Sequence, residues 1–289
     1  MILCIYSLLT LIMVALSFLL GYHDIINGIS FVFSALSTGG FAPLGDITTV
    51  ATLFPMNMIL IVSMVLGAMN FFMLAGLFKR RFREFLKSEF SLFVIIVISA
   101  IILSTVFIKI SLYDSTFHVI SAMSTTGFSY LPLTQFTDSF KMLLIILMFI
   151  GGASFSTAGG IKIYRLVLLL KTVKKAVVDT ITSKDNPIKL FGKEYSNVEI
   201  IQTVALVFLM IIIIIISSFI ITLYGFKPVD SMFEATSAIA TTGISVGVVT
   251  PSIALELKWL FIFLMLIGRV EIIAFLIIFT RTKQPKPSA

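Results

Sequence analysis

The sequence has little charge and almost no cysteine. Only 12% of its 289 residues are charged, whereas 58% are hydrophobic and the mean hydropathy is +1.12. A soluble domain of this size needs more polar surface, so we expect lipid to surround most of the chain. Cys4 is the only cysteine, which excludes an intrachain disulfide.

Catalytic signatures are also lacking. The two histidines, His23 and His118, stand alone, and the sequence contains no Walker loop, no cluster of metal ligands and no nucleophile paired with a base. We therefore expect that the chain is not an enzyme and holds no cofactor of its own. The net charge of +7 would suit nucleic acid, but in so apolar a chain we interpret it as a topology signal and expect no nucleic-acid partner.

Long apolar runs are abundant. A helix that crosses a bilayer needs about 20 predominantly apolar residues, and six segments reach about this length, the fourth with an interruption. They are Ile2–Leu20, Met56–Phe78, Phe90–Ile110, Met142–Leu170, Val204–Leu223 and Leu257–Phe279. The predicted fold class is therefore an all-α integral membrane protein in a lipid bilayer.

The basic residues predict the orientation of these spans. Most of the 21 Lys and Arg residues lie in the linkers 79–89 and 171–199 and in the tail after the last span. The positive-inside rule makes these segments cytoplasmic. We expect a multi-pass protein of the plasma membrane, with the linkers and the C-terminus inside the cell and the opposite connections outside it.

The chain reads as three tandem units of one kind, each consisting of a span, a reentrant segment and a second span. The units cover residues 1–83, 84–193 and 194–289. Their reentrant segments hold three related stretches: "NGISFVFSALSTGG" (27–40), "DSTFHVISAMSTTG" (114–127) and "DSMFEATSAIATTG" (230–243). The last two align without gaps, and the first keeps the Ser-Ala pair, the Thr and the final Gly. Each stretch predicts a short helix that enters from outside, with Asn27, Asp114 and Asp230 as N-caps, followed by an irregular return.

Each reentrant segment ends in a turn rich in threonine and glycine. The turn residues are Thr38, Gly39, Gly40, Thr125, Thr126, Gly127, Thr241, Thr242 and Gly243. Irregular backbone at membrane depth is costly unless it lines a water-filled path, and its carbonyl oxygens can replace the water around a cation. We therefore interpret the turns as strands of an ion selectivity filter. The alternative is helix–helix packing through small residues, which does not account for a turn repeated in register.

A second polar stretch, "GGASFSTAGG" at 151–160, interrupts the fourth apolar run. Glycine costs about 1 kcal/mol relative to alanine in a helix interior, so four glycines close together predict unwound backbone. Such a segment at mid-membrane would obstruct a pore. The candidate gate residues are Gly151, Gly152, Ser154, Ser156, Thr157, Gly159 and Gly160. The alternative is a close-packed helix with a glycine face.

Two charged residues in the last unit need separate explanations. Arg269 lies inside the last apolar run, where a charge is expensive and usually faces a cavity or a partner. The alternative for Arg269 is a structural ion pair with another helix. Glu234 is assigned to the first turn of its short helix, where the helix dipole is sufficient to explain a carboxylate.

Together these motifs resemble the pore-forming membrane subunit of the Trk/Ktr/HKT superfamily of potassium and sodium transporters. The stretches that carry the resemblance are "STGGF" (37–41), "STTGF" (124–128), "ATTGIS" (240–245), "GGASFSTAGGIKIYR" (151–165) and "GRVEIIAF" (268–275). The resemblance implies potassium uptake, with K⁺ as the transported ion held at the turn residues. It also implies that 151–160 is an intramembrane gate loop and that Arg269 forms an electrostatic barrier and holds that loop. The implied partners are a second copy of the chain, giving a homodimer, and a cytosolic nucleotide-binding RCK ring docked at 171–199.

The resemblance further implies four M1–pore helix–M2 repeats around one pore. The three units resemble the second, third and fourth repeats, and the sequence offers no counterpart of the first. We therefore expect either a truncated reading frame or another polypeptide that completes the filter. One alternative to potassium uptake is a non-conducting remnant or assembly subunit that needs a first repeat in trans. Another is sodium transport, because the first-repeat filter position separates the two ion types; the three visible glycines favour potassium.

Overall fold

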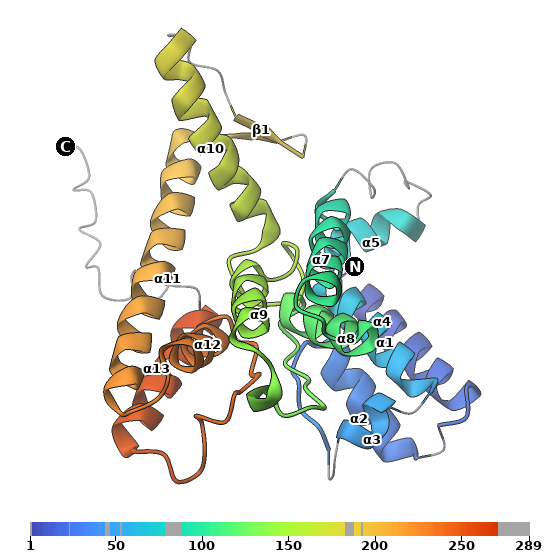
Figure 1. Ribbon diagram of the computed structural model, residues 1–289. Coiled ribbons are helices and arrows are strands. Elements are labelled where there is room, and N and C mark those ends of the chain that lie inside the picture. The colour runs from blue at the N-terminus through green and yellow to red at the C-terminus, as the bar shows by residue number, and fades with distance from the viewer. Residues whose placement is uncertain are drawn as a thin grey trace, which may run out of the picture.

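A computed structural model describes residues 2–22, 24–43, 47–52, 54–78, 88–182, 188–191 and 193–270. Over these ranges the regular secondary structure is α-helical, apart from a 3-10 turn and a short β-hairpin (Figure 1). Three of the described helices are long and apolar enough to cross a membrane: α1 (Ile2–Leu19), α7 (Glu89–Val106) and α11 (Asn197–Leu223). Only 28–33% of the residues in the apolar stretch of each of these helices are buried inside the protein. Their remaining apolar surface faces outward, which suits helices surrounded by lipid.

The N-terminal third is a group of short helices around α1. It contains α2 (Ile25–Leu36), α3 (Ile47–Thr52), α4 (Met56–Ala68) and α5 (Phe71–Phe78). The predicted span Met56–Phe78 is thus wrong as one helix, because it breaks between α4 and α5. The cause is Asn70, whose Oδ1 accepts hydrogen bonds from the backbone N–H groups of Phe72 (2.9 Å) and Met73 (3.3 Å) and so begins a new helix.

The central part of the chain follows α7. It contains α8 (Leu112–Met123), the 3-10 turn η1 (Leu133–Gln135), α9 (Asp138–Ile150) and α10 (Ile163–Thr182). The break between α9 and α10 is the predicted interruption of the fourth apolar run. In Figure 1, α9 lies between α8 and α12, and both of these helices pack against it.

The last part contains a hairpin and three helices. Strands β1 (Ile188–Leu190) and β2 (Lys193–Tyr195) pair antiparallel, with Ile188 opposite Tyr195. This hairpin, inside the linker predicted to be cytoplasmic, is an exception to the all-α prediction. Helix α11 starts seven residues before the predicted span Val204–Leu223, because Ser196 and Glu199 form a capping box. Helices α12 (Pro228–Ile239) and α13 (Leu255–Val270) follow, and the rest of the predicted last span lies outside the described residues.

The three predicted pore helices are α2, α8 and α12, and each is 12 residues long. Their predicted N-caps were wrong. The N-cap residues are Asp24, Ser111 and Lys227, three positions before Asn27, Asp114 and Asp230. The side chains of Asp24 and Ser111 accept hydrogen bonds from the backbone N–H groups of Asn27 and Asp114, so these later residues lie within the first turn. Lys227 makes no side-chain cap, and Pro228 after it sets the helical φ.

Candidate functional site

Three turns of one backbone shape follow the short helices. We call them the first turn (residues 37–40), the second turn (124–127) and the third turn (240–243). In each turn one threonine and the closing glycine have positive φ: 52° at Thr38, 70° at Gly40, 52° at Thr125, 88° at Gly127, 53° at Thr241 and 86° at Gly243. Positive φ is uncommon for threonine. Its recurrence at one register means that the three repeated sequences adopt the same conformation.

The first and second turns each pack against the next turn through their closing glycine. A Cβ atom added to Gly40 would collide with the carbonyl oxygen of Thr126, and one added to Gly127 would collide with the carbonyl oxygen of Thr242. No described atom lies within 4 Å of such an atom at Gly243. The first turn therefore lies beside the second, and the second beside the third. Only glycine permits this approach of one backbone to the next.

A serine in each short helix distinguishes the first turn from the other two. Ser121 Oγ donates to the carbonyl oxygen of Phe128 at 2.6 Å, and Ser237 Oγ donates to that of Ile244 at 2.6 Å. The equivalent serine of α2, Ser34, is buried, and its hydroxyl has no hydrogen-bond partner among the described residues. The second and third turns thus share a stabilising contact that the first turn lacks.

The interrupting loop, residues 151–160, lies against the second and third turns and against the end of α2, which leads into the first turn. Thr157 Oγ1 lies 2.9 Å from the carbonyl oxygen of Gly67 in α4 and 3.1 Å from that of Leu36, the last residue of α2 before the first turn. The backbone N–H of Gly159 donates to Thr125 Oγ1 of the second turn at 2.5 Å. A Cβ atom added to Gly159 would collide with the carbonyl oxygen of Ala240 in the third turn. The structure therefore brings together the two regions that the sequence marked as filter and gate.

The other side of the interrupting loop is held by what we call the loop anchor, Asn70, Glu89 and Ser154. The Glu89 side chain is buried at the start of α7, and its carboxylate accepts from the backbone N–H of Ser154 at 2.6 Å and from the Ser154 hydroxyl. Asn70 Nδ2 lies 3.4 Å from the same hydroxyl. Next to the anchor, the rings of Phe72 and Phe155 meet edge to face with centroids 5.1 Å apart. The loop is thus tied to α5 and α7 as well as to the turns.

A cavity of about 840 Å³ lies between the interrupting loop and the β-hairpin. Its charged and aromatic lining includes Glu89, Lys162, Tyr164, Arg165, Lys193, Tyr195 and Glu199. Lys162 Nζ donates to the carbonyl oxygen of Ala158 in the loop. On the hairpin side, Lys193 Nζ lies 2.6 Å from a Glu199 carboxylate oxygen, and this hydrogen bond raises the pKa of the Lys193 ammonium. The cavity therefore opens onto Ser154, Phe155 and Ser156 of the interrupting loop.

Helices α4 and α13 each pack a glycine against the C-terminal end of a short helix, α2 and α12 respectively. A Cβ atom added to Gly67 of α4 would collide with the carbonyl oxygen of Leu36, and one added to Gly268 of α13 would collide with that of Ile239. Arg269 follows Gly268 directly, and its side chain is exposed. Within the described ranges Arg269 makes no hydrogen bond or ion pair. Arg269 thus follows a residue that lies against the end of α12, but the structure does not bring its guanidinium onto the interrupting loop.

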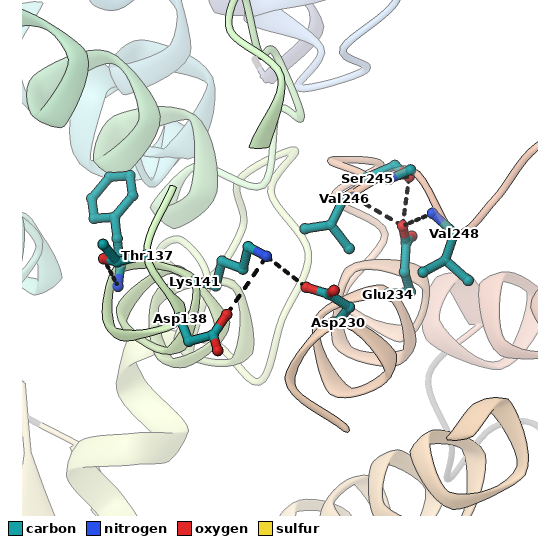
Figure 2. Close-up of polar contacts among 10 residues, drawn as sticks. Thr137, Asp138, Lys141, Asp230, Glu234, Ser245, Val246 and Val248 are labelled. Carbon is teal, nitrogen blue, oxygen red and sulfur yellow. Dashed lines mark hydrogen bonds and ion pairs between the residues drawn. The ribbon is translucent and has the colours of Figure 1, made fainter. Parts of the chain in front are cut away.

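A buried ion pair joins α9 to α12. Lys141 is only 5% exposed, and its Nζ lies 2.7 Å from Asp230 Oδ1 and 3.7 Å from Asp138 Oδ1 (Figure 2). The side chain of Asp230 is 20% exposed, whereas that of Asp138 is 63% exposed. Lys141–Asp230 is therefore the more protected contact, and it connects the helix before the interrupting loop with the helix before the third turn.

Three of these side chains were missed or misinterpreted at the level of the sequence. Glu89 and Lys141 had no role there, since their partners lie 65 and 89 residues away along the chain. Glu234 is not in the first turn of α12, where Asp230 is the acidic residue, but deeper in the helix and only 3% exposed. The gapless alignment of α8 with α12 offered a signal for Glu234, because it pairs this residue with His118.

Comparison with known proteins gives consistent results. The model of the family described as "TrkH: Cation transport protein" matches residues 85–288. An uncharacterized cation transporter of Methanocaldococcus jannaschii is 32% identical over 95% of this chain and 58% of its own length. The Ktr system potassium uptake protein B of Bacillus subtilis is 27% identical over 79% of this chain and 54% of its own. The Trk system potassium uptake protein TrkH of Salmonella typhimurium is 27% identical over 96% of this chain and 60% of its own.

The fold is also found in a solved structure. The potassium transporter TrkH from Vibrio parahaemolyticus matches with a TM-score of 0.79 and 21% identity, covering 95% of this chain and 62% of that one. The chain thus spans 54–60% of the length of the three relatives above. With a family match over residues 85–288 and helices suited to a membrane, the chain belongs to the TrkH family of cation transport proteins.

Proposed function

We propose that the chain forms part of a pore that takes up potassium ions across the plasma membrane. The observation that carries this proposal is the contact of one glycine-rich loop with the second and third turns and with the helix end that leads into the first turn. The glycines of the first and second turns lie against carbonyl oxygens of the next turn, and backbone carbonyl oxygens are the groups that replace the water around a potassium ion. The named relatives from Bacillus and Salmonella are potassium uptake proteins. K⁺ is therefore the proposed ion at the threonines and glycines of the turns.

In this proposal the chain consists of three M1–pore helix–M2 repeats, at 1–83, 84–193 and 194–289. The turns face the outside of the cell, and the linkers and the C-terminus face the cytoplasm. Gly243 has no described neighbour on the side where Gly40 and Gly127 each meet the next turn. A further turn from outside the described residues packs there and closes the filter.

The interrupting loop is the proposed gate. It contributes neutral hydrogen bonds to the turns and is held on its other side by the loop anchor. Arg269 adds an electrostatic barrier in the pathway, and its guanidinium engages the loop in the completed assembly. A guanidinium suits this role because it keeps its charge and offers several donors in a plane.

The proposed partners are a second copy of the chain and a cytosolic nucleotide-binding RCK-type subunit. The docking surface for that subunit is the linker 171–199, where the β-hairpin presents the exposed ion pairs Lys189–Glu194 and Lys193–Glu199. The hairpin shares a cavity with the interrupting loop. A regulator bound at the hairpin would therefore act close to the gate.

Flux measurements test the proposal against its two alternatives. The chain is reconstituted in liposomes, alone and together with the N-terminal portion of the Bacillus relative supplied as a separate polypeptide. We expect rubidium uptake, with discrimination against sodium, in at least the second preparation. A folded assembly without flux would favour a non-conducting assembly subunit, and equal sodium and rubidium flux would favour sodium transport.

A further inference from the structure

Glu234 is a buried carboxylate that the ion pathway described above does not use. It is 3% exposed, and its Oε1 accepts three hydrogen bonds: from Ser245 Oγ at 2.5 Å, from the Val246 N–H at 2.9 Å and from the Val248 N–H at 3.2 Å (Figure 2). All three donors lie in the segment that follows the third turn. A carboxylate with several donors holds their positions strongly, because hydrogen bonds to an ionised acceptor are stronger than neutral ones.

The second turn has a counterpart at the same alignment position. His118 of α8 aligns with Glu234 of α12, and Ser129 aligns with Ser245. His118 is fully buried, with Nε2 3.2 Å from Ser129 Oγ and Nδ1 2.8 Å from the carbonyl oxygen of Asp114. Two different polar side chains thus reach the equivalent serine after two equivalent turns. What the two positions share is a hydrogen bond from the short helix to the serine after the turn, made by different residue types.

These contacts add to the serine bonds already described. In the third unit, Ser237 holds the carbonyl oxygen of Ile244, the residue directly after the closing glycine. Glu234 holds the next segment through Ser245 and Val246. The segment 244–246, which follows the third turn, is therefore bonded to α12 at three consecutive residues. These bonds restrict the backbone next to the carbonyl groups of the turn.

We propose that Glu234 is a positioning residue for ion selectivity, with His118 in the same role for the second turn. The inference rests on the proposed function, since it requires that the turns bind the permeating cation. Glu234 keeps the strand after Gly243 in place, so the turn retains the geometry that favours the larger ion.

The test compares Glu234→Ala, Glu234→Gln and the matched control Glu256→Ala in the complete conducting assembly. Glu256 is an exposed carboxylate in the first turn of α13, away from the turns. We expect Glu234→Ala to lower the rubidium-to-sodium flux ratio by about tenfold, because three bonds to an ionised acceptor are lost. Glu234→Gln retains an acceptor oxygen at the same place and is expected to retain most of the discrimination. Glu256→Ala should leave the ratio unchanged.

Hydrogen exchange provides a readout that does not depend on transport. The Val246 and Val248 amides should exchange faster in Glu234→Ala than in wild type or Glu234→Gln. Faster exchange with an unchanged flux ratio would show a purely structural role and overturn the inference, as would unchanged exchange. Loss of discrimination in Glu234→Gln equal to that in Glu234→Ala would also overturn positioning. A wild-type assembly that conducts nothing would refute the proposed function and the selectivity role together, while exchange would still report the contact.

Discussion

Replacing Glu89 should open the pathway, because this carboxylate is the only charged acceptor described at the interrupting loop. Glu89→Ala removes the bonds from the N–H and the hydroxyl of Ser154. The contacts of Thr157 with Leu36 at the end of α2 and of Gly159 with the second turn remain. The substitution therefore loosens the loop on one side without touching the residues proposed to coordinate the ion.

The size of the effect follows from the bonds that are lost. Each hydrogen bond to a charged group contributes about 1.5–3 kcal/mol. Water replaces part of this, and the contacts around Phe155 persist, so we expect a net shift of about 2 kcal/mol toward the open loop. That shift corresponds to about a 30-fold larger open-to-closed ratio. Glu89→Gln, which keeps one acceptor oxygen, should give a smaller increase.

The assay is rubidium flux per folded molecule in liposomes, with folding checked by size exclusion and thermal unfolding. Ser99→Ala is the control on the same helix, because this exposed hydroxyl bonds only to the carbonyl oxygen of Ile96 on its own helix. Glu89→Ala should have no further effect once the interrupting loop is deleted. Unchanged flux at matched folded protein, or an equal increase in the loop-deleted background, would refute the anchoring argument.

Three further substitutions probe other parts of the same structure. Gly127→Ser should lower potassium over sodium discrimination, because a Cβ collides with the carbonyl oxygen of Thr242; an unchanged rubidium-to-sodium flux ratio would contradict this. Arg269→Ala should raise flux per folded molecule if the guanidinium is a barrier, and equal flux would favour the ion-pair interpretation. Lys141→Ala should destabilise the fold by about 3–5 kcal/mol, because it leaves the Asp230 carboxylate without its buried partner. Thermal unfolding of Lys141→Ala and of the double variant with Asp230→Ala checks this, since the double variant should be less destabilised than the sum of the two single variants.

Local sequence signals predicted the turns and the interruption. Glycine clusters and a repeated Thr-Gly pattern are local signals, because each occupies only a few consecutive residues. The structure has the turns at equivalent positions of the repeats and the helix break at Gly151. Helix starts were predicted less well. The caps at Asp24 and Ser111 precede the first residues of the aligned stretches, so an alignment that begins at Asn27 and Asp114 could not include them.

Contacts between distant segments could not be predicted from the sequence. Ser154 and Glu89 are 65 residues apart, and Thr157 and Leu36 are 121 apart. Nothing in the local composition around Glu89 distinguishes it from a charge at a membrane boundary. The contact of the Asn70 amide with Ser154, 84 residues away, belongs to the same class, although the helix break at Asn70 is itself local. The sequence thus predicted which segments are irregular, whereas the contacts between these segments are known only from the structure.

The two sides of the interrupting loop are held by different kinds of interaction, and this has a consequence for opening. On the side of the turns the loop donates neutral hydrogen bonds from Thr157 and Gly159. On the cavity side it binds the carboxylate of Glu89, and the ammonium of Lys162 binds the carbonyl oxygen of Ala158. Charged contacts respond to a nearby charge more strongly than neutral ones do. If the loop is the gate, as proposed, we expect a charged regulator or an ion in the cavity to act first on the contacts of Glu89 and Lys162, so that the loop is released from that side before it leaves the turns.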